Sequence, residues 1–154
     1  MSKWTNRYLE IAKQVAQWSK DPSTKIGAIA VGDKRQILSQ GYNGFPRGIS
    51  DSDERLENRE EKYSYIVHGE MNCIYNATLN GVSLEGAHLY VYGLPVCHEC
   101  AKGIIQVGIS KVVMQYSKDI SDKWKLSANT TKRMFKEARV QCISLDEEGN
   151  VIHD

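Results

Sequence analysis

The sequence has no long apolar run, no excess of one charge and little proline. No apolar run approaches the roughly 18 to 20 residues that a membrane-spanning helix needs, so we expect no membrane insertion. The 20 basic residues are offset by 19 acidic ones, so no overall field attracts a nucleic acid or an anionic membrane surface. With 3 prolines, 12 glycines and 41% hydrophobic residues, the 154-residue chain can form one core but hardly two. We therefore expect a single domain, 1–154, with neither nucleic acid nor membrane as partner.

The chain also lacks the features of a secreted protein. Residues 1–7 carry a charge every few positions, unlike the apolar segment of a signal peptide. Without such a segment, the four cysteines (Cys73, Cys97, Cys100 and Cys142) point to a reducing compartment, where closely spaced thiols more often bind a metal than form disulfides. We expect a cytoplasmic protein, of a bacterium or of a virus-infected host cell.

Hydrophobic periodicity predicts a domain in which strands alternate with helices. Apolar residues three and four apart predict helices at 3–19, 69–79, 99–107 and 127–138. Short apolar runs predict strands at 26–31, 37–42, 87–92, 111–115 and 140–145, the first two as a hairpin. This alternation favours a central sheet with helices on both faces, followed by a loose polar tail at 146–154.

The stretch 43–65 differs in kind from the rest of the chain. It begins with turn-forming residues and continues with densely mixed charges. A structureless loop of this length is improbable inside a compact domain. We therefore expect a functional insertion that contains a short helix, in which Glu57 faces Glu61 and Arg55 faces Arg59.

Two fragments carry the candidate chemistry, His68-Gly-Glu70 and Cys97-His-Glu-Cys100. Positions three apart share a helix face, so Cys97 and Cys100 can meet one ion, with His68 as third ligand. Three protein ligands leave the fourth position of a tetrahedral zinc open to water, as in catalytic zinc sites. Glu70, beside this water, is suited to transfer its protons.

The two fragments together predict hydrolytic deamination of a nucleobase. His-x-Glu followed by Pro-Cys-x-x-Cys is the signature of zinc nucleobase deaminases, in which the glutamate acts as acid and base and does not bind the metal. The alternative is a structural zinc site closed by Cys73 or His98 as fourth ligand, which would leave Glu70 without a role.

Four segments in a fixed order give the chain a resemblance to a known family. They are 19–28 (SKDPSTKIGA), 41–46 (GYNGFP), 68–72 (HGEMN) and 97–102 (CHECAK). From about Trp18 to Leu145 the chain resembles the deoxycytidylate (dCMP) deaminases. It departs from their pattern at Gly69, where alanine is usual, and at Val96, which separates Pro95 from Cys97.

The resemblance implies a fold, a reaction and an assembly. The implied fold is the three-layer α/β fold of cytidine deaminases, a five-stranded mixed sheet with helices on both faces. The implied reaction is the zinc-dependent conversion of dCMP to dUMP and ammonia, by a homohexamer that dCTP activates and dTTP inhibits. The domain as a whole is then a single zinc-dependent deaminase domain.

The resemblance also implies roles for individual residues. Glu70 is the catalytic residue, and His68, Cys97 and Cys100 are the zinc ligands. The substrate-binding candidates are Asn43 for the sugar, the Gly69 N–H for the cytosine carbonyl, Lys25 for a phosphate or regulatory contact together with the Ser23 and Thr24 hydroxyls, and either Tyr116 or Trp124 for stacking on the base.

The resemblance further implies that a regulatory triphosphate binds at the turn-rich segment after the second strand. Its candidate residues are Gly41, Tyr42, Asn43, Gly44, Phe45, Pro46 and Arg47. Arg47 and Arg55 supply positive charge, and Mg²⁺ accompanies the nucleotide, held mainly by phosphates and waters. Tyr42 and Phe45 can equally pack against the core. The insertion 43–65 is thus a regulatory or oligomer-contact element.

Other notable residues have structural explanations. Trp4, Tyr8 and Trp18 form one helix stripe and are expected in the core. Cys73 and Cys142 are expected as small core residues, and His98 and Glu99 at the surface.

Two kinds of alternative function remain open. One is another activity of the same superfamily, on free cytidine, guanine or adenosine in tRNA. The balanced charge weighs against a tRNA substrate, because RNA binding ordinarily needs a basic face. The other is a non-catalytic nucleotide-binding module that zinc stabilises.

Overall fold

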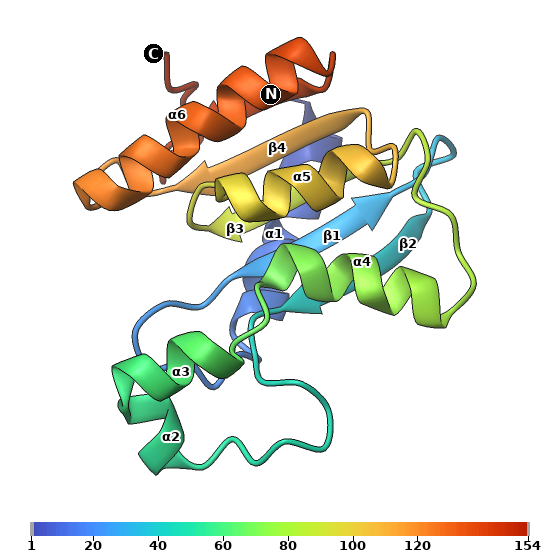
Figure 1. Ribbon diagram of the computed structural model, residues 1–154. Helices are drawn as coiled ribbons and strands as arrows, with labels where there is room; N and C mark the ends of the chain where they lie inside the picture. Colours follow the sequence, from blue (N-terminus) through green and yellow to red (C-terminus); the bar gives the residue numbers. More distant parts are fainter. Residues whose placement is uncertain (1, 154) are drawn as a thin grey trace.

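A computed structural model describes residues 2–153; Met1 and Asp154, the ends of the predicted domain, lie outside the described residues. Within 2–153, strands and helices alternate after an opening hairpin (Figure 1). The elements are α1 Lys3–Ala16, β1 Gly27–Val31, β2 Ile37–Tyr42, α2 Asp53–Glu57, α3 Arg59–Tyr65, α4 Gly69–Leu79, β3 His88–Gly93, α5 His98–Gln106, β4 Lys111–Tyr116, α6 Asp122–Glu137 and β5 Gln141–Leu145.

The described residues form one mixed five-stranded sheet, as expected. Its strand order is β2-β1-β3-β4-β5. β1 pairs antiparallel with β2 and with β3, whereas β3–β4 and β4–β5 are parallel pairs. The parallel pairs need crossover connections, which α5 and α6 provide. The carboxyl ends of β3 and β4 therefore lie at the same edge of the sheet.

Helices cover both faces of the sheet and make three layers (Figure 1). Side chains of one strand alternate between the faces. Ile29 and Tyr90 pack with α1 on one face, while the neighbouring Ala28 and Val91 pack with α4, α5 and α6 on the other. This arrangement confirms the predicted three-layer α/β fold. In the part of the chain that the structure describes, no helix has the length and apolar character needed to cross a membrane.

The structure corrects three expectations, two on helix boundaries and one on the polar tail. α1 ends at Ala16, so Trp18 lies beyond the helix stripe, is 55% exposed and contacts the edge of Tyr42; its predicted core position was wrong. α6 begins at Asp122, five residues before the predicted start at 127. Periodicity missed this first part because its first turn is mostly polar. The tail after β5 is ordered through residue 153: the Asp146 carboxylate accepts backbone N–H bonds from Glu148 and Asn150.

The remaining core and surface expectations are confirmed. Tyr8 is buried, and Trp4 packs partly buried beside it. Cys73 is fully buried, and Cys142 packs partly buried against the same core. The exposed side chains of α5 include those of His98 and Glu99, the latter paired with Lys102.

The insertion 43–65 contains the short helices α2 and α3 in place of the single predicted helix. Asn58 separates them, with extended backbone, and its side chain accepts the Glu61 N–H at the start of α3. Glu57 and Glu61 therefore do not share a helix face, nor do Arg55 and Arg59. Instead, Arg55 pairs with Glu61 across the break, at 3.1 Å.

Candidate active site

The N-termini of two helices meet beyond the carboxyl end of β3. His68 is the N-cap residue of α4, and Cys97 is the N-cap residue of α5. The loop between β3 and α5 is held at Val96, whose N–H contacts the Met114 sulfur at 3.4 Å and whose carbonyl accepts the Thr131 hydroxyl at 2.8 Å. Val96, which departs from the family pattern, is thus a buried anchor of the loop that presents Cys97.

Three ligand-type atoms converge at this point. His68 Nδ1 lies 3.2 Å from Cys100 Sγ and 3.4 Å from Cys97 Sγ. All three atoms lie within 4.8 Å of one another. One imidazole and two thiols form a donor set that suits Zn²⁺. The residues therefore fit a zinc ion with three protein ligands.

Neither residue proposed to close a structural site joins this group. Among residues 2–153, the group contains only His68, Cys97 and Cys100. Cys73 is buried in the core beneath β2. The ring of His98 faces away and contacts the Ser127 hydroxyl at 2.8 Å. The geometry is that of an open site and not of a closed one.

Hydrogen bonds among the three donors shift their pKa values in opposite directions. A hydrogen bond with Cys100, and a further one with His68, lower the pKa of the Cys97 thiol. The hydrogen bond between His68 and Cys97 also raises the pKa of His68. The lowered pKa of Cys97 favours its thiolate, the form that binds metals, whereas the hydrogen bond with Cys97 and burial raise the pKa of Cys100.

Glu70 lies in the first turn of α4, next to the metal-binding group. Its side chain is buried, with 4% of the residue exposed. Burial raises the pKa of Glu70 to about 7, although the neighbouring His68 opposes the rise. A carboxyl group with a pKa near neutrality is suited to accept and return protons.

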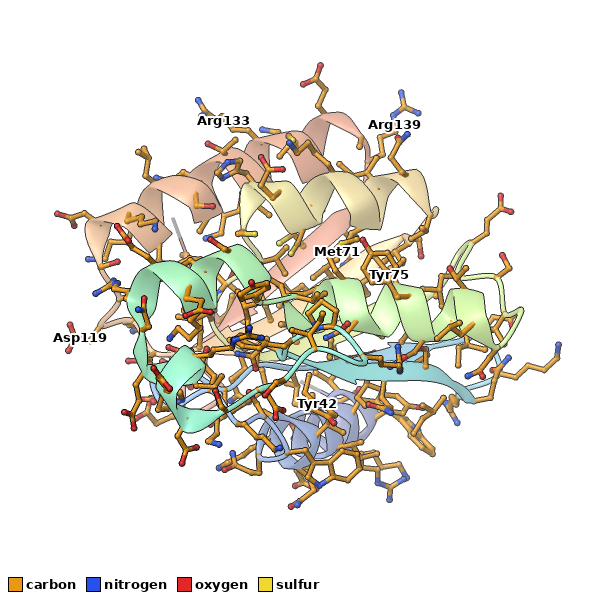
Figure 2. All side chains as sticks on the ribbon, turned by 60° about the horizontal axis from the view of Figure 1, so that its bottom comes forward. Tyr42, Met71, Tyr75, Asp119, Arg133 and Arg139 are labelled. Carbon is orange, nitrogen blue, oxygen red and sulfur yellow. The ribbon has the colours of Figure 1, made fainter. Side chains whose placement is uncertain are left out.

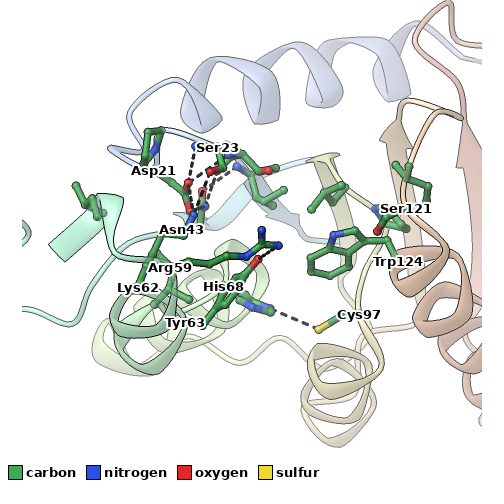
Figure 3. Close-up of a pocket in the computed structure, with 18 of the residues that line it drawn as sticks. Asp21, Ser23, Asn43, Arg59, Lys62, Tyr63, His68, Cys97, Ser121 and Trp124 are labelled. Carbon is green, nitrogen blue, oxygen red and sulfur yellow. Dashed lines mark hydrogen bonds and ion pairs between the residues drawn. The ribbon is translucent and has the colours of Figure 1, made fainter. Parts of the chain in front are cut away.

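His68, Glu70 and Cys97 line a cavity of about 670 Å³ (Figure 3). The other walls come from the loop before β1, from α2 and α3, and from the segment between β4 and α6. A cavity of this size suits a small ligand. Of the two candidate stacking residues, Trp124 lines the cavity, whereas Tyr116 is buried in the core.

The other predicted substrate residues have mixed positions. Asn43 lines the cavity, and its amide fixes the loop before β1, accepting the Ile26 N–H at 2.8 Å and donating to the Thr24 carbonyl at 2.9 Å. Lys25 is exposed outside the cavity and donates to the Ser19 carbonyl. Gly69 is buried, and a Cβ there would lie 3.1 Å from the Ile26 carbonyl oxygen, a reason for glycine at this position.

The side chains of the segment 41–47, expected to bind a triphosphate, contact different parts of the molecule. Of its residues, Asn43 lines the cavity described above. Tyr42 lies at the surface against Trp18 (Figure 2), and Phe45 packs on Tyr65 with ring centroids 5.6 Å apart. Arg47 donates to the Asn76 amide oxygen at 2.6 Å.

Sequence reasoning missed the contribution of α3 to the cavity. Arg59, Lys62 and Tyr63 line it, although the mixed charges there resemble an ordinary solvated face. Lys62 is buried and forms an ion pair with Asp21, Nζ to Oδ1 at 3.1 Å. The spacing of Arg59 and Tyr63, four residues apart, was the available signal that both side chains share one face.

Comparison with known proteins shows to which family the chain belongs. Residues 2–116 match the family model of the cytidine and deoxycytidylate deaminase zinc-binding region. The chain is 41% identical, over 142 residues, to a protein of Aliivibrio fischeri named as an uncharacterized deaminase in the luxG 3′ region, with 92% of each chain covered. It is 40% identical to the deoxycytidylate deaminase of Mus musculus, covering 89% of this chain and 76% of the mouse protein.

A solved structure is similar in fold. The dCMP deaminase of cyanophage S-TIM5, crystallised in complex with dCMP and dUMP, superposes with a TM-score of 0.74 at 23% identity. The match covers 94% of this chain and 99% of the phage protein.

Proposed function

Because the chain belongs to the cytidine and deoxycytidylate deaminase family, we propose that it converts dCMP and water to dUMP and ammonia. The observation that carries the proposal is the open group of His68, Cys97 and Cys100, with the buried Glu70 in the same cavity. Relatives named deoxycytidylate deaminase support dCMP as the substrate. Deamination by water makes the enzyme a hydrolase.

His68, Cys97 and Cys100 would hold the zinc ion through Nδ1 and the two Sγ atoms. A bound zinc ion would supply Lewis acidity and lower the pKa of the attacking water. The chain's contribution is to hold the three donors at the first turns of α4 and α5, where the sheet and the Val96 anchor fix them.

Glu70 moves the protons of the reaction. Water oxygen bonds to C4 of the cytosine ring while Glu70 takes a proton from the water and delivers it to ring nitrogen N3. Glu70 then carries the second water proton to the amino nitrogen, and the C4–N bond breaks to release ammonia. A pKa of about 7 allows the carboxyl group to act in both directions near neutral pH.

Three further groups orient the substrate in this proposal. Asn43 contacts the sugar, the Gly69 N–H binds the cytosine carbonyl, and Trp124 stacks on the base. Each lies at or beside the cavity that contains Glu70. A buried glycine lets the backbone approach the ring closely.

The test is the loss of cytosine absorbance when zinc-loaded protein meets dCMP, CMP, deoxycytidine and dCTP in separate assays. We expect turnover of dCMP. If dCMP is not deaminated, free cytidine, guanine and adenosine in tRNA are assayed separately, and turnover of one of them would reassign the substrate. No turnover of any of these would leave a non-catalytic zinc-stabilised module.

Regulation, assembly and location complete the proposal and rest on the family resemblance. We propose that dCTP with Mg²⁺ activates the enzyme through the 41–47 segment, that dTTP inhibits it, and that it works as a cytoplasmic homohexamer. Repeating the dCMP assay with each triphosphate tests the regulation. If neither triphosphate changes the rate, the regulatory role of 41–47 is excluded while the catalytic proposal stands.

A further inference from the structure

We propose that Arg59 of α3 binds the 5′-phosphate of the substrate and thereby makes the enzyme prefer a nucleoside monophosphate to the free nucleoside. This inference rests on the proposed function, and it names the residue that selects the substrate class. The cation expected from the sequence, Lys25, lies outside the cavity.

The position of Arg59 is the first argument. Its side chain lines the same cavity as His68, Glu70 and Trp124. Figure 3 shows it extending from α3 into that cavity, towards the space between His68 and Trp124. A nucleotide whose base lies against Trp124 and Glu70 would present its phosphate within the same cavity.

The charges around the cavity are the second argument. Two cationic side chains line it, Lys62 and Arg59. Lys62 is neutralised by Asp21 and also contacts the Ser23 hydroxyl. Arg59 has no carboxylate partner among residues 2–153; its guanidinium donates to the Tyr63 hydroxyl at 3.2 Å. Most of its five N–H donors remain available to phosphate oxygens.

The acidic residues at the cavity increase the importance of Arg59. Glu57 lines it at the end of α2, and Asp119 lines it on another side while pointing outward (Figure 2). Neither of these carboxylates forms an ion pair within the described part of the chain. Without Arg59, no Lys or Arg side chain described at the cavity would be free of a carboxylate partner to meet the phosphate dianion. Discrimination between nucleotide and nucleoside should therefore depend strongly on this one guanidinium.

The helix that carries Arg59 is well anchored. The buried Lys62–Asp21 pair fixes α3 to the loop before β1, and Asn58 caps its first turn. Arg59 is thus presented from a fixed backbone, which reduces the entropy lost when it binds phosphate. The other arginines of the insertion are engaged elsewhere, Arg55 with Glu61 and Arg47 with Asn76.

The experiment compares Arg59→Gln, Arg59→Lys and the unchanged enzyme on dCMP and on deoxycytidine, all zinc-loaded and without triphosphates. We expect Arg59→Gln to lower kcat/KM for dCMP by about 10- to 100-fold, mainly through KM, because a charge-assisted hydrogen bond is lost. The value for deoxycytidine should change by less than about 2-fold, since no phosphate is present. Arg59→Lys, which keeps the charge, should restore part of the loss.

A matched control removes the same charge elsewhere. Arg133 is exposed on α6 and contacts Thr130, so Arg133→Gln should leave both substrates unaffected. If deoxycytidine turnover is too slow to measure, calorimetric titration with dUMP and with deoxyuridine gives the same comparison: Arg59→Gln should weaken dUMP alone.

The outcomes separate this inference from the proposed function. Equal losses on both substrates would give Arg59 a structural role, and no loss on either would place the phosphate elsewhere; both overturn the inference. An unchanged enzyme that fails to deaminate dCMP would instead overturn the proposed function.

Discussion

At the scale of single residues, burial gives Glu70 its chemical character. The sequence places a carboxylate two positions after His68, which by itself says nothing of its pKa. The folded chain removes this carboxylate from water, and desolvation raises its pKa to about 7. The same packing keeps it beside the ligand atoms of His68 and Cys97.

We predict that Glu70→Gln lowers kcat for dCMP by about 10²- to 10⁴-fold, because the amide cannot accept and return the proton. Zinc content, measured by atomic absorption, and the melting temperature should change little, since Glu70 is not one of the metal-binding donors. Loss of zinc together with activity would contradict the assignment of Glu70 as the proton carrier.

At the scale of elements, α3, expected as part of a regulatory or oligomer-contact insertion, forms a wall of the cavity. Its mixed charges conceal one buried ion pair, Lys62 with Asp21. Asp21 also accepts the backbone N–H groups of Ser23 and Thr24, so the pair orders the loop that faces the site. The insertion 43–65 therefore forms part of the cavity wall.

We predict that Lys62→Met destabilises the protein by about 3 to 5 kcal/mol, because it leaves the Asp21 carboxylate buried without a counter-charge. The measurement is denaturant-induced unfolding. Lys20→Met is the matched control: its ion pair with Asp51 is exposed and should contribute about 0 to 1 kcal/mol. Asp21→Asn combined with Lys62→Met should recover part of the loss. Equal effects of the two lysine changes would contradict the structural role.

The contact between β2 and α4 explains one glycine of the 41–46 segment without reference to a ligand. A Cβ on Gly41 would lie 2.2 Å from the Cys73 backbone nitrogen, because the strand and the helix approach closely there. Gly44 has no atom within 4 Å of such a Cβ. The two glycines of one motif therefore have different physical reasons.

We predict that Gly41→Ala costs about 1 to 3 kcal/mol or more, through displacement of α4. Because α4 carries His68 and Glu70, activity should fall as well. Gly44→Ala should change stability by less than about 0.5 kcal/mol. Unfolding curves of the two variants make the comparison, and equal stability of both would show that the β2–α4 approach is not as close as described.

At the scale of the whole molecule, the sheet brings together two helix N-termini that are 29 residues apart in sequence, at His68 and Cys97. α4 packs on β2 and β1, whereas α5 follows β3 and packs against α6. A metal ion bound between α4 and α5 would therefore link the two halves of one helical layer.

We predict that removing zinc with a chelator abolishes activity and lowers the melting temperature by roughly 5 to 10 °C, as follows when a ligand at about 100 times its Kd is withdrawn from a domain of this size. Adding zinc back should restore both. A melting temperature that does not respond to zinc would show that the metal contributes nothing to the fold.

The sequence determined the order of the elements and the chemical identity of the metal-binding group. Periodicity located the core strands and helices, since burial on both faces of a sheet imposes it. Two short motifs were enough to nominate His68, Cys97, Cys100 and Glu70, because ligand and proton-transfer chemistry permit few residue types. Periodicity did not locate the end of α1 at Ala16, because a helix boundary depends on capping and not on periodicity.

Only the tertiary structure decided which other residues share the cavity. Trp124 and Arg59 line the cavity, whereas Tyr116 and Lys25 do not. This division depends on how distant segments of the chain pack. Local sequence does not record such contacts: a buried Lys62 and an exposed lysine have the same letter and similar neighbours. Sequence therefore specifies the reacting groups, and packing specifies the space in which they act.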